Sequence, residues 1–84
     1  MDIKILGTGC ARCKKLFAVA EEAVRRSGQA ASLTKVEDLQ AIMAYGVRQT
    51  PALVLDGKVR SMGRIPGAEE IAGWIAQAAA RTDG

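Results

Sequence analysis

The chain has 84 residues, of which 49% are apolar and 25% are charged, and its formal net charge is only +3. This length and composition fit one globular domain spanning residues 1–84. No segment reads as a membrane span or a secretion signal, so we expect a cytoplasmic protein without membrane contact. The basic residues are scattered and the chain holds one Phe, one Tyr and one Trp, which argues against nucleic-acid binding, and we expect a monomer.

The first part of the chain predicts a strand, a helix and a second strand. Residues 3–6 form a short apolar run that ends at Gly7-Thr8-Gly9, which is typical of a strand followed by a turn. From residue 11 to about residue 26 the apolar residues recur at helical spacing. That apolar face consists of Cys13, Leu16, Phe17, Ala20 and Val24. Residues 30–36 end in an alternating pattern and predict a strand parallel to the first, joined to it by a right-handed crossover.

A short helix and a hairpin follow. The helix opens at Glu37-Asp38 and stops at Gly46, and its predicted buried side chains are Leu39, Ile42 and Met43. Residues 52–62 predict two antiparallel strands, 52–55 and 58–62. The Asp56-Gly57 pair between them suits a two-residue turn because both residues tolerate a positive φ.

The chain closes with a helix over residues 68–81. Its predicted inner face consists of Ile71, Trp74, Ile75 and Ala78. The whole order is therefore β-α-β-α-β-β-α. We expect an α/β fold in which a mixed four-stranded sheet carries helices on both faces.

The two cysteines, Cys10 and Cys13, point to thiol chemistry. A disulfide between residues so close together closes too small a loop to stabilise a fold, so the pair is expected to be catalytic or metal-binding in a reducing compartment. Cys10 falls at the predicted start of the first helix, where backbone N–H groups and the helix dipole favour a thiolate. Nearby cations act in the same direction, and the candidates are Arg12, Lys14, Lys15 and Arg48.

The two cysteines are expected to differ in reactivity. Thiols at positions like that of Cys10 have pKa values of about 3.5–7.5, against about 8.5 for an unperturbed cysteine. Cys13 lies one turn further on, on the apolar face with Leu16 and Phe17, where burial favours the protonated thiol. Cys10 is therefore the predicted attacking group and Cys13 the predicted resolving group.

Several of these features together resemble the thioredoxin superfamily. They are the Cys10-Ala11-Arg12-Cys13 motif at a strand-to-helix junction, Thr50-Pro51 before a hairpin, the Asp-Gly turn and the closing helix. The chain is most similar to the small glutaredoxin-like and thioredoxin-like redox-active disulfide proteins of microbes. Proline also fits the first residue of a strand, and only about 5–6% of X–Pro bonds in folded proteins are cis, so a cis bond at Pro51 follows from the resemblance alone.

The resemblance implies roles for four residues. In that family the first cysteine attacks, the second resolves, and the residue before a cis-proline pairs with the substrate backbone. Those roles fall on Cys10, Cys13, Thr50 and Pro51. The implied activity is exchange with protein or small-molecule disulfides. The implied partners are a disulfide-containing protein substrate and a reductase or dithiol donor, with no cofactor and no bound metal. Ala11-Arg12 replaces the residue pairs usual between the cysteines, so the redox potential and its direction stay open.

Two other functions use the same residues. Two thiolates in a Gly7-Thr8-Gly9-Cys10 loop also suit a carrier of Cu(I), a soft ion that prefers thiolate ligands. The heavy-metal-associated domains that this loop resembles run β-α-β-β-α-β and end on a strand, whereas this chain ends on a predicted helix. The third possibility is a thioredoxin-like binding module that does not catalyse disulfide exchange.

Overall fold

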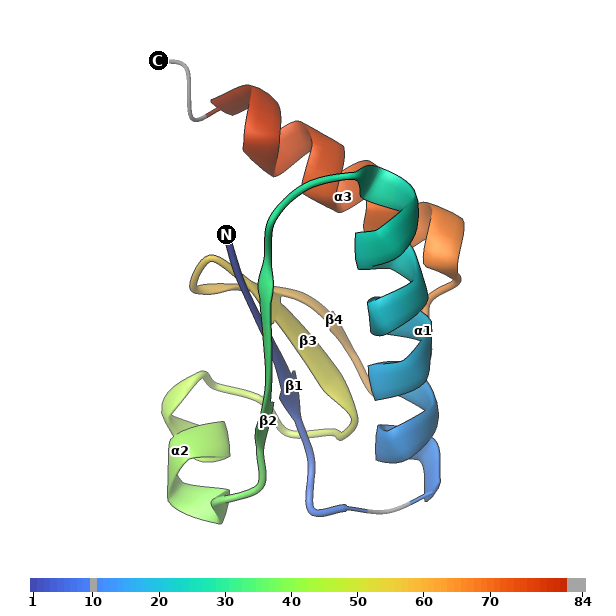
Figure 1. Cartoon of the computed structure of the whole chain (residues 1–84). Helices are drawn as coiled ribbons and strands as arrows, with labels where there is room; N and C mark the ends of the chain where they lie inside the picture. The colour runs from blue at the N-terminus through green and yellow to red at the C-terminus, as the bar shows by residue number, and fades with distance from the viewer. Residues whose placement is uncertain (10, 82–84) are drawn as a thin grey trace.

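The computed structural model describes residues 1–9 and 11–81. Its secondary structure has the predicted order (Figure 1). The elements are β1 (Asp2–Leu6), α1 (Ala11–Ser27), β2 (Ser32–Val36), α2 (Leu39–Ala44), β3 (Ala52–Leu55), β4 (Lys58–Met62) and α3 (Ala68–Arg81). In the described part of the chain, no helix is long and apolar enough to cross a membrane.

The four strands form one mixed sheet in the order β2-β1-β3-β4. β1 and β2 are parallel, with Ile5 opposite Lys35 and Leu6 opposite Val36. β3 runs antiparallel to both β1 and β4. Because β1 and β2 are parallel, their carboxyl ends lie at the same edge of the sheet, and the loops that follow them become neighbours.

The turn between β3 and β4 has the predicted conformation. Asp56 has a φ of 49° and Gly57 a φ of 84°, so both central residues lie in the left-handed region that a tight hairpin turn requires. The Asp56 side chain also accepts a hydrogen bond from the Asp2 backbone N–H, at 2.8 Å. The turn is thereby tied to the start of β1.

Helices cover both faces of the sheet, as the sequence predicts. α1 and α3 pack on one face, and α2 lies on the other (Figure 1). The larger core, under α1 and α3, consists of Ile3, Ile5, Leu16, Ala20, Ala23, Leu53, Leu55, Ile71 and Ile75. The smaller core, under α2, consists of Leu6, Ile42, Val47, Ala52 and Val54. Alternate residues of β1 and β3 therefore serve opposite cores, as the pleat of a strand demands.

The prediction for the buried side of α2 was wrong at two of three positions. Ile42 is 2% exposed, but Leu39 is 60% and Met43 63% exposed. The helix has only six residues and begins at Leu39, where Asp38 caps it by accepting a hydrogen bond from the Ala41 N–H. So short a helix presents one side chain to the sheet, and Val47 beyond its end supplies the next buried group.

This difference predicts unequal effects on stability. Ile42→Ala is expected to lower the free energy of unfolding by about 2–5 kcal/mol, because it leaves a cavity in the smaller core. Leu39→Ala and Met43→Ala are expected to change it by no more than about 0.5 kcal/mol, since both side chains are exposed. Urea unfolding followed by circular dichroism measures all three. A loss for Leu39→Ala as large as that for Ile42→Ala would contradict this description of α2.

Candidate active site

Cys13 is held at the junction of β1 and α1. It lies in the first turn of α1 and is only 6% exposed, which confirms its predicted burial. Its sulfur packs directly against Gly7, and a Cβ placed on Gly7 would collide with it. The same Cβ would stand 3.9 Å from the Cβ of Thr50, so the Cys13 sulfur and the Thr50 side chain both lie beside Gly7. Cys10 lies outside the described residues.

Thr50 and Pro51 approach from the loop before β3. The peptide bond between them is cis, Pro51 is fully buried and Thr50 is half-buried. The carbonyl of Pro51 accepts a hydrogen bond of 2.9 Å from the N–H of Gly63. The loop that follows β4 therefore supports the segment that lies beside the Cys13 sulfur.

Gly63 also receives the side chain of Arg12. A guanidinium nitrogen of Arg12 donates to the carbonyl of Gly63 at 3.0 Å. Gly63 has a φ of 76°, and a Cβ there would collide with the Gln49 side chain, so the position favours glycine on both counts. One residue thus links the start of α1 to the Thr50-Pro51 segment through two hydrogen bonds.

A pair of charges holds the next residues of that loop. Arg64 donates two hydrogen bonds, of 3.1 and 2.7 Å, to the Glu70 carboxylate in the first turn of α3. These contacts hold the pKa of Glu70 below its ordinary value, chiefly through the hydrogen bonds from Arg64. The pair anchors the loop after Gly63 to α3.

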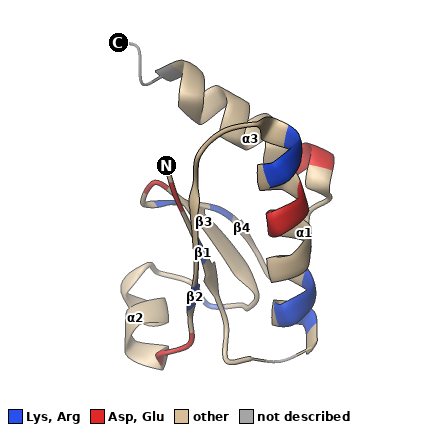
Figure 2. Cartoon of the chain, in the orientation of Figure 1, with Lys and Arg blue, Asp and Glu red and all other residues tan. Residues whose placement is uncertain are grey.

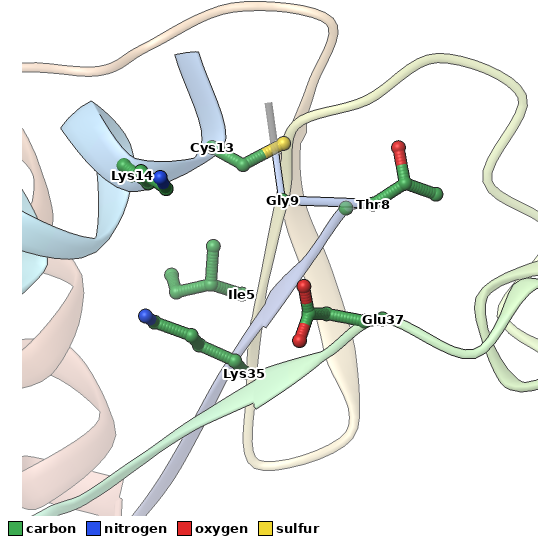
Figure 3. A pocket seen from close by; sticks show the side chains of 8 residues that line it. Ile5, Thr8, Gly9, Cys13, Lys14, Lys35 and Glu37 are labelled. Carbon is green, nitrogen blue, oxygen red and sulfur yellow. The ribbon is translucent and has the colours of Figure 1, made fainter. Parts of the chain in front are cut away.

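A cavity of about 290 Å³ opens beside Cys13 (Figure 3). It lies between the start of α1 and the carboxyl ends of β1 and β2. Its lining residues are Ile5, Gly7, Thr8, Gly9, Cys13, Lys14, Lys35 and Glu37. Three of its side chains carry charge, and they come from α1, from β2 and from the residue after β2.

Comparisons with known proteins show which family the chain resembles. A sequence profile of the thioredoxin domain matches residues 1–76. The chain is 41% identical over 71 residues to a thioredoxin of Methanothermobacter thermautotrophicus, which covers 84% of this chain and 92% of that protein. It is 36% identical over 69 residues to a thioredoxin of Methanocaldococcus jannaschii, which covers 82% of this chain and 79% of that protein.

The chain belongs to the thioredoxin family. This confirms the resemblance and the fold that it implies. Thioredoxins are thiol–disulfide oxidoreductases that act on disulfide substrates together with reductase partners. The membership therefore supports a disulfide oxidoreductase activity for this chain.

The predicted cations of this thioredoxin-family site lie in different places. Lys14 reaches the cavity beside Cys13, whereas Lys15 lines a separate groove with Ile65 and Pro66. Arg48 is exposed in the loop before Thr50. Figure 2 shows the basic residues that gather at the start of α1.

Lys35 and Glu37 line the cavity but are absent from the residues that the sequence predicts for the site. Both reach it through the parallel pairing of β1 and β2, which places the end of β2 beside the loop that leads to Cys10. The sequence holds one signal for them, because predicted parallel strands end at the same edge of a sheet. The local sequence gives no further indication, since Lys35 fits an ordinary strand position and Glu37 an ordinary helix start.

Substitutions of Arg12 test whether this residue acts through its hydrogen bond to Gly63 or only through its charge. Arg12→Ala and Arg12→Lys are both expected to raise the KM for a protein disulfide substrate, with a smaller change in kcat, because both lose the contact that ties the start of α1 to Gly63. The net value of one hydrogen bond, about three- to ten-fold, sets the upper limit of the effect. Lysine keeps the charge but lacks the fork of guanidinium donors that reaches Gly63. Steady-state insulin reduction measures both constants. Full rescue by lysine would show that only the charge of Arg12 matters.

Proposed function

We propose that this protein reduces or forms disulfides through a dithiol made of Cys10 and Cys13. The single observation that carries the proposal is the setting of Cys13. In a thioredoxin-family fold, its buried sulfur packs against Gly7 beside Thr50, in the first turn of α1. A buried thiol at that place suits the second step of an exchange, because burial favours its protonated form until it is needed.

The proposed cycle transfers two electrons from the dithiol to the substrate disulfide. The Cys10 thiolate attacks one sulfur of a substrate disulfide, and the other substrate sulfur leaves as a thiolate. Cys13 loses its proton to solvent and attacks the Cys10 sulfur of the mixed disulfide, which releases the second substrate thiolate. Cys10 and Cys13 end as a disulfide, and the substrate has gained both electrons. A reductase or a dithiol donor returns the pair to its reduced form.

The position of Cys10 in the sequence supports its role as the attacking group. It directly precedes α1, a helix of 17 residues that has no acidic residue in its first turn. The unpaired N–H groups and the dipole at such a helix start favour a thiolate. The exposed cations Arg12 and Lys14 follow within four residues and act in the same direction.

Two further features support a protein substrate. Thr50 is half-buried beside Gly7, a position from which its backbone can pair with an extended substrate chain. Exposed cations lie close in the chain to Cys10 or to Thr50, and they are Arg12, Lys14, Lys15 and Arg48. We propose acidic protein partners whose association weakens as salt rises, in a cytoplasmic reaction that needs no cofactor.

Insulin reduction tests this proposal against its two alternatives. With dithiothreitol as donor, the protein is expected to accelerate reduction of the insulin disulfides catalytically, many turnovers per molecule. The same preparation is titrated with Cu(I) against a chromophoric chelator of known affinity. Tight one-to-one Cu(I) binding without insulin turnover would establish the metal carrier instead. If the protein neither reduced insulin nor bound Cu(I) tightly, the binding module without turnover would be the remaining alternative.

A further inference from the structure

The cavity beside Cys13 combines charges of both signs. Lys14 comes from α1 and Lys35 from β2, and Glu37 adds a carboxylate just beyond β2 (Figure 3). Ile5 supplies an apolar surface between them. The cavity volume of about 290 Å³ lies just below the usual range for ligand sites, about 300–1,000 Å³. It suits a small molecule with both a negative and a positive group.

The backbone keeps this cavity open and its charges in place. Gly7 and Gly9 line it without side chains, and a Cβ on Gly9 would come within 2.8 Å of a Glu37 carboxylate oxygen. The Lys35 ammonium lies 4.8 Å from the centre of the Phe17 ring, a cation–π contact that holds it toward α1.

We propose that this cavity binds the α-amino-acid end of a small disulfide, with cystine as the simplest example. The ligand carboxylate lies between the ammonium groups of Lys14 and Lys35, and its ammonium group faces the Glu37 carboxylate. Gly9 is part of the lining and directly precedes Cys10 in the sequence, so a ligand held here lies beside the segment that leads to the attacking residue.

This inference rests on the proposed dithiol function and specifies which small-molecule disulfides the site would take. The reaction is the same exchange: reduced Cys10 and Cys13 give two electrons to one cystine, and two cysteines leave. A purely anionic ligand would face repulsion from Glu37, and a purely cationic one would face repulsion from both lysines. A zwitterion offers a group of opposite charge to each of the three side chains, Lys14, Lys35 and Glu37.

The test compares three disulfides that differ only in which charges they carry. Cystine has both groups, cystamine has only ammonium groups, and 3,3′-dithiodipropionate has only carboxylates. Pre-reduced protein is mixed with each in single-turnover reactions, quenched with iodoacetamide and analysed by mass. The ratio of variant to wild-type rate is taken for each disulfide, which cancels its intrinsic reactivity.

The variants are expected to separate the three substrates. Lys35→Gln lowers the rate of reduction of cystine and of dithiodipropionate by about three- to five-fold but does not change the rate for cystamine. Glu37→Gln lowers the rate of reduction of cystine and of cystamine by a similar factor and does not change the rate for dithiodipropionate. The matched controls Lys58→Gln and Glu69→Gln remove exposed charges elsewhere and leave all three rates unchanged.

Two results would overturn parts of the account separately. Equal variant-to-wild-type ratios for all three disulfides would show that the cavity does not select charge, while insulin reduction by the wild type would keep the proposed dithiol function intact. Failure of the wild-type protein to reduce either insulin or any small disulfide would reject the dithiol function itself.

Discussion

Cys13→Ser is expected to accumulate a mixed disulfide between Cys10 and the substrate, whereas Cys10→Ser is expected to lose exchange altogether. Without the thiol of Cys13, nothing in the chain attacks the mixed disulfide, because the sequence holds only two cysteines. Without Cys10, the remaining cysteine is only 6% exposed and its sulfur is packed against Gly7, out of reach of a protein disulfide. The two variants therefore fail at different steps of one cycle.

Non-reducing electrophoresis and intact mass measure the trapped species with insulin as substrate. Cys13→Ser places a hydroxyl in a buried site and is expected to cost about 1–3 kcal/mol of stability, so circular dichroism must first show that it is folded. Addition of dithiothreitol should release the substrate from the trapped species. Turnover at the wild-type rate by either variant would contradict the proposed division of roles.

Gly7→Ala is expected to disable the site and destabilise the fold. Its new Cβ would collide with the Cys13 sulfur. The backbone has little freedom to move away, because the Gly7 N–H donates to the Val36 carbonyl at 3.0 Å. The thiol of Cys13 must therefore shift, at a cost of about 1–3 kcal/mol for overpacking a buried site. We expect insulin turnover to fall in parallel, since resolution depends on the position of that sulfur.

Gly73→Ala is the matched control for this substitution. Gly73 lies within α3 and is exposed, and a Cβ added there would have nothing within 4 Å. Alanine there should stabilise the protein by about 0.5–1 kcal/mol through its higher helix propensity, with no effect on turnover. Urea unfolding and insulin reduction of both variants complete the comparison. A Gly7→Ala protein as stable and active as wild type would contradict the described packing.

The sequence predicts the fold well where local signals decide it. The apolar run before Gly7, the helical spacing from Cys13 onward and the Asp56-Gly57 turn each reflect residues close in the chain. They give the element order and, with the crossover rule, the parallel pairing of β1 and β2. The strand boundaries shift by a residue or two, because the ends of elements depend on hydrogen bonds to neighbouring strands.

The sequence predicts less where long-range packing decides. Leu39 and Met43 have the spacing of a buried stripe, but the six-residue α2 presents only Ile42 to the sheet. The hydrogen bond from Arg12 joins residues 51 positions apart, and no local pattern contains it. Lys35 and Glu37 reach the Cys13 cavity only through the register of β2 against β1.

The rate of alkylation at Cys10 as a function of pH is the most direct measurement of the proposed chemistry. In the Cys13→Ser variant, Cys10 is the only cysteine left, so iodoacetamide reports its thiolate fraction alone. The helix start and its cations predict an apparent pKa below about 7.5, against about 8.5 for an unperturbed cysteine. An alkylation rate that rises only well above pH 8 would mean that residue 10 is not an activated nucleophile.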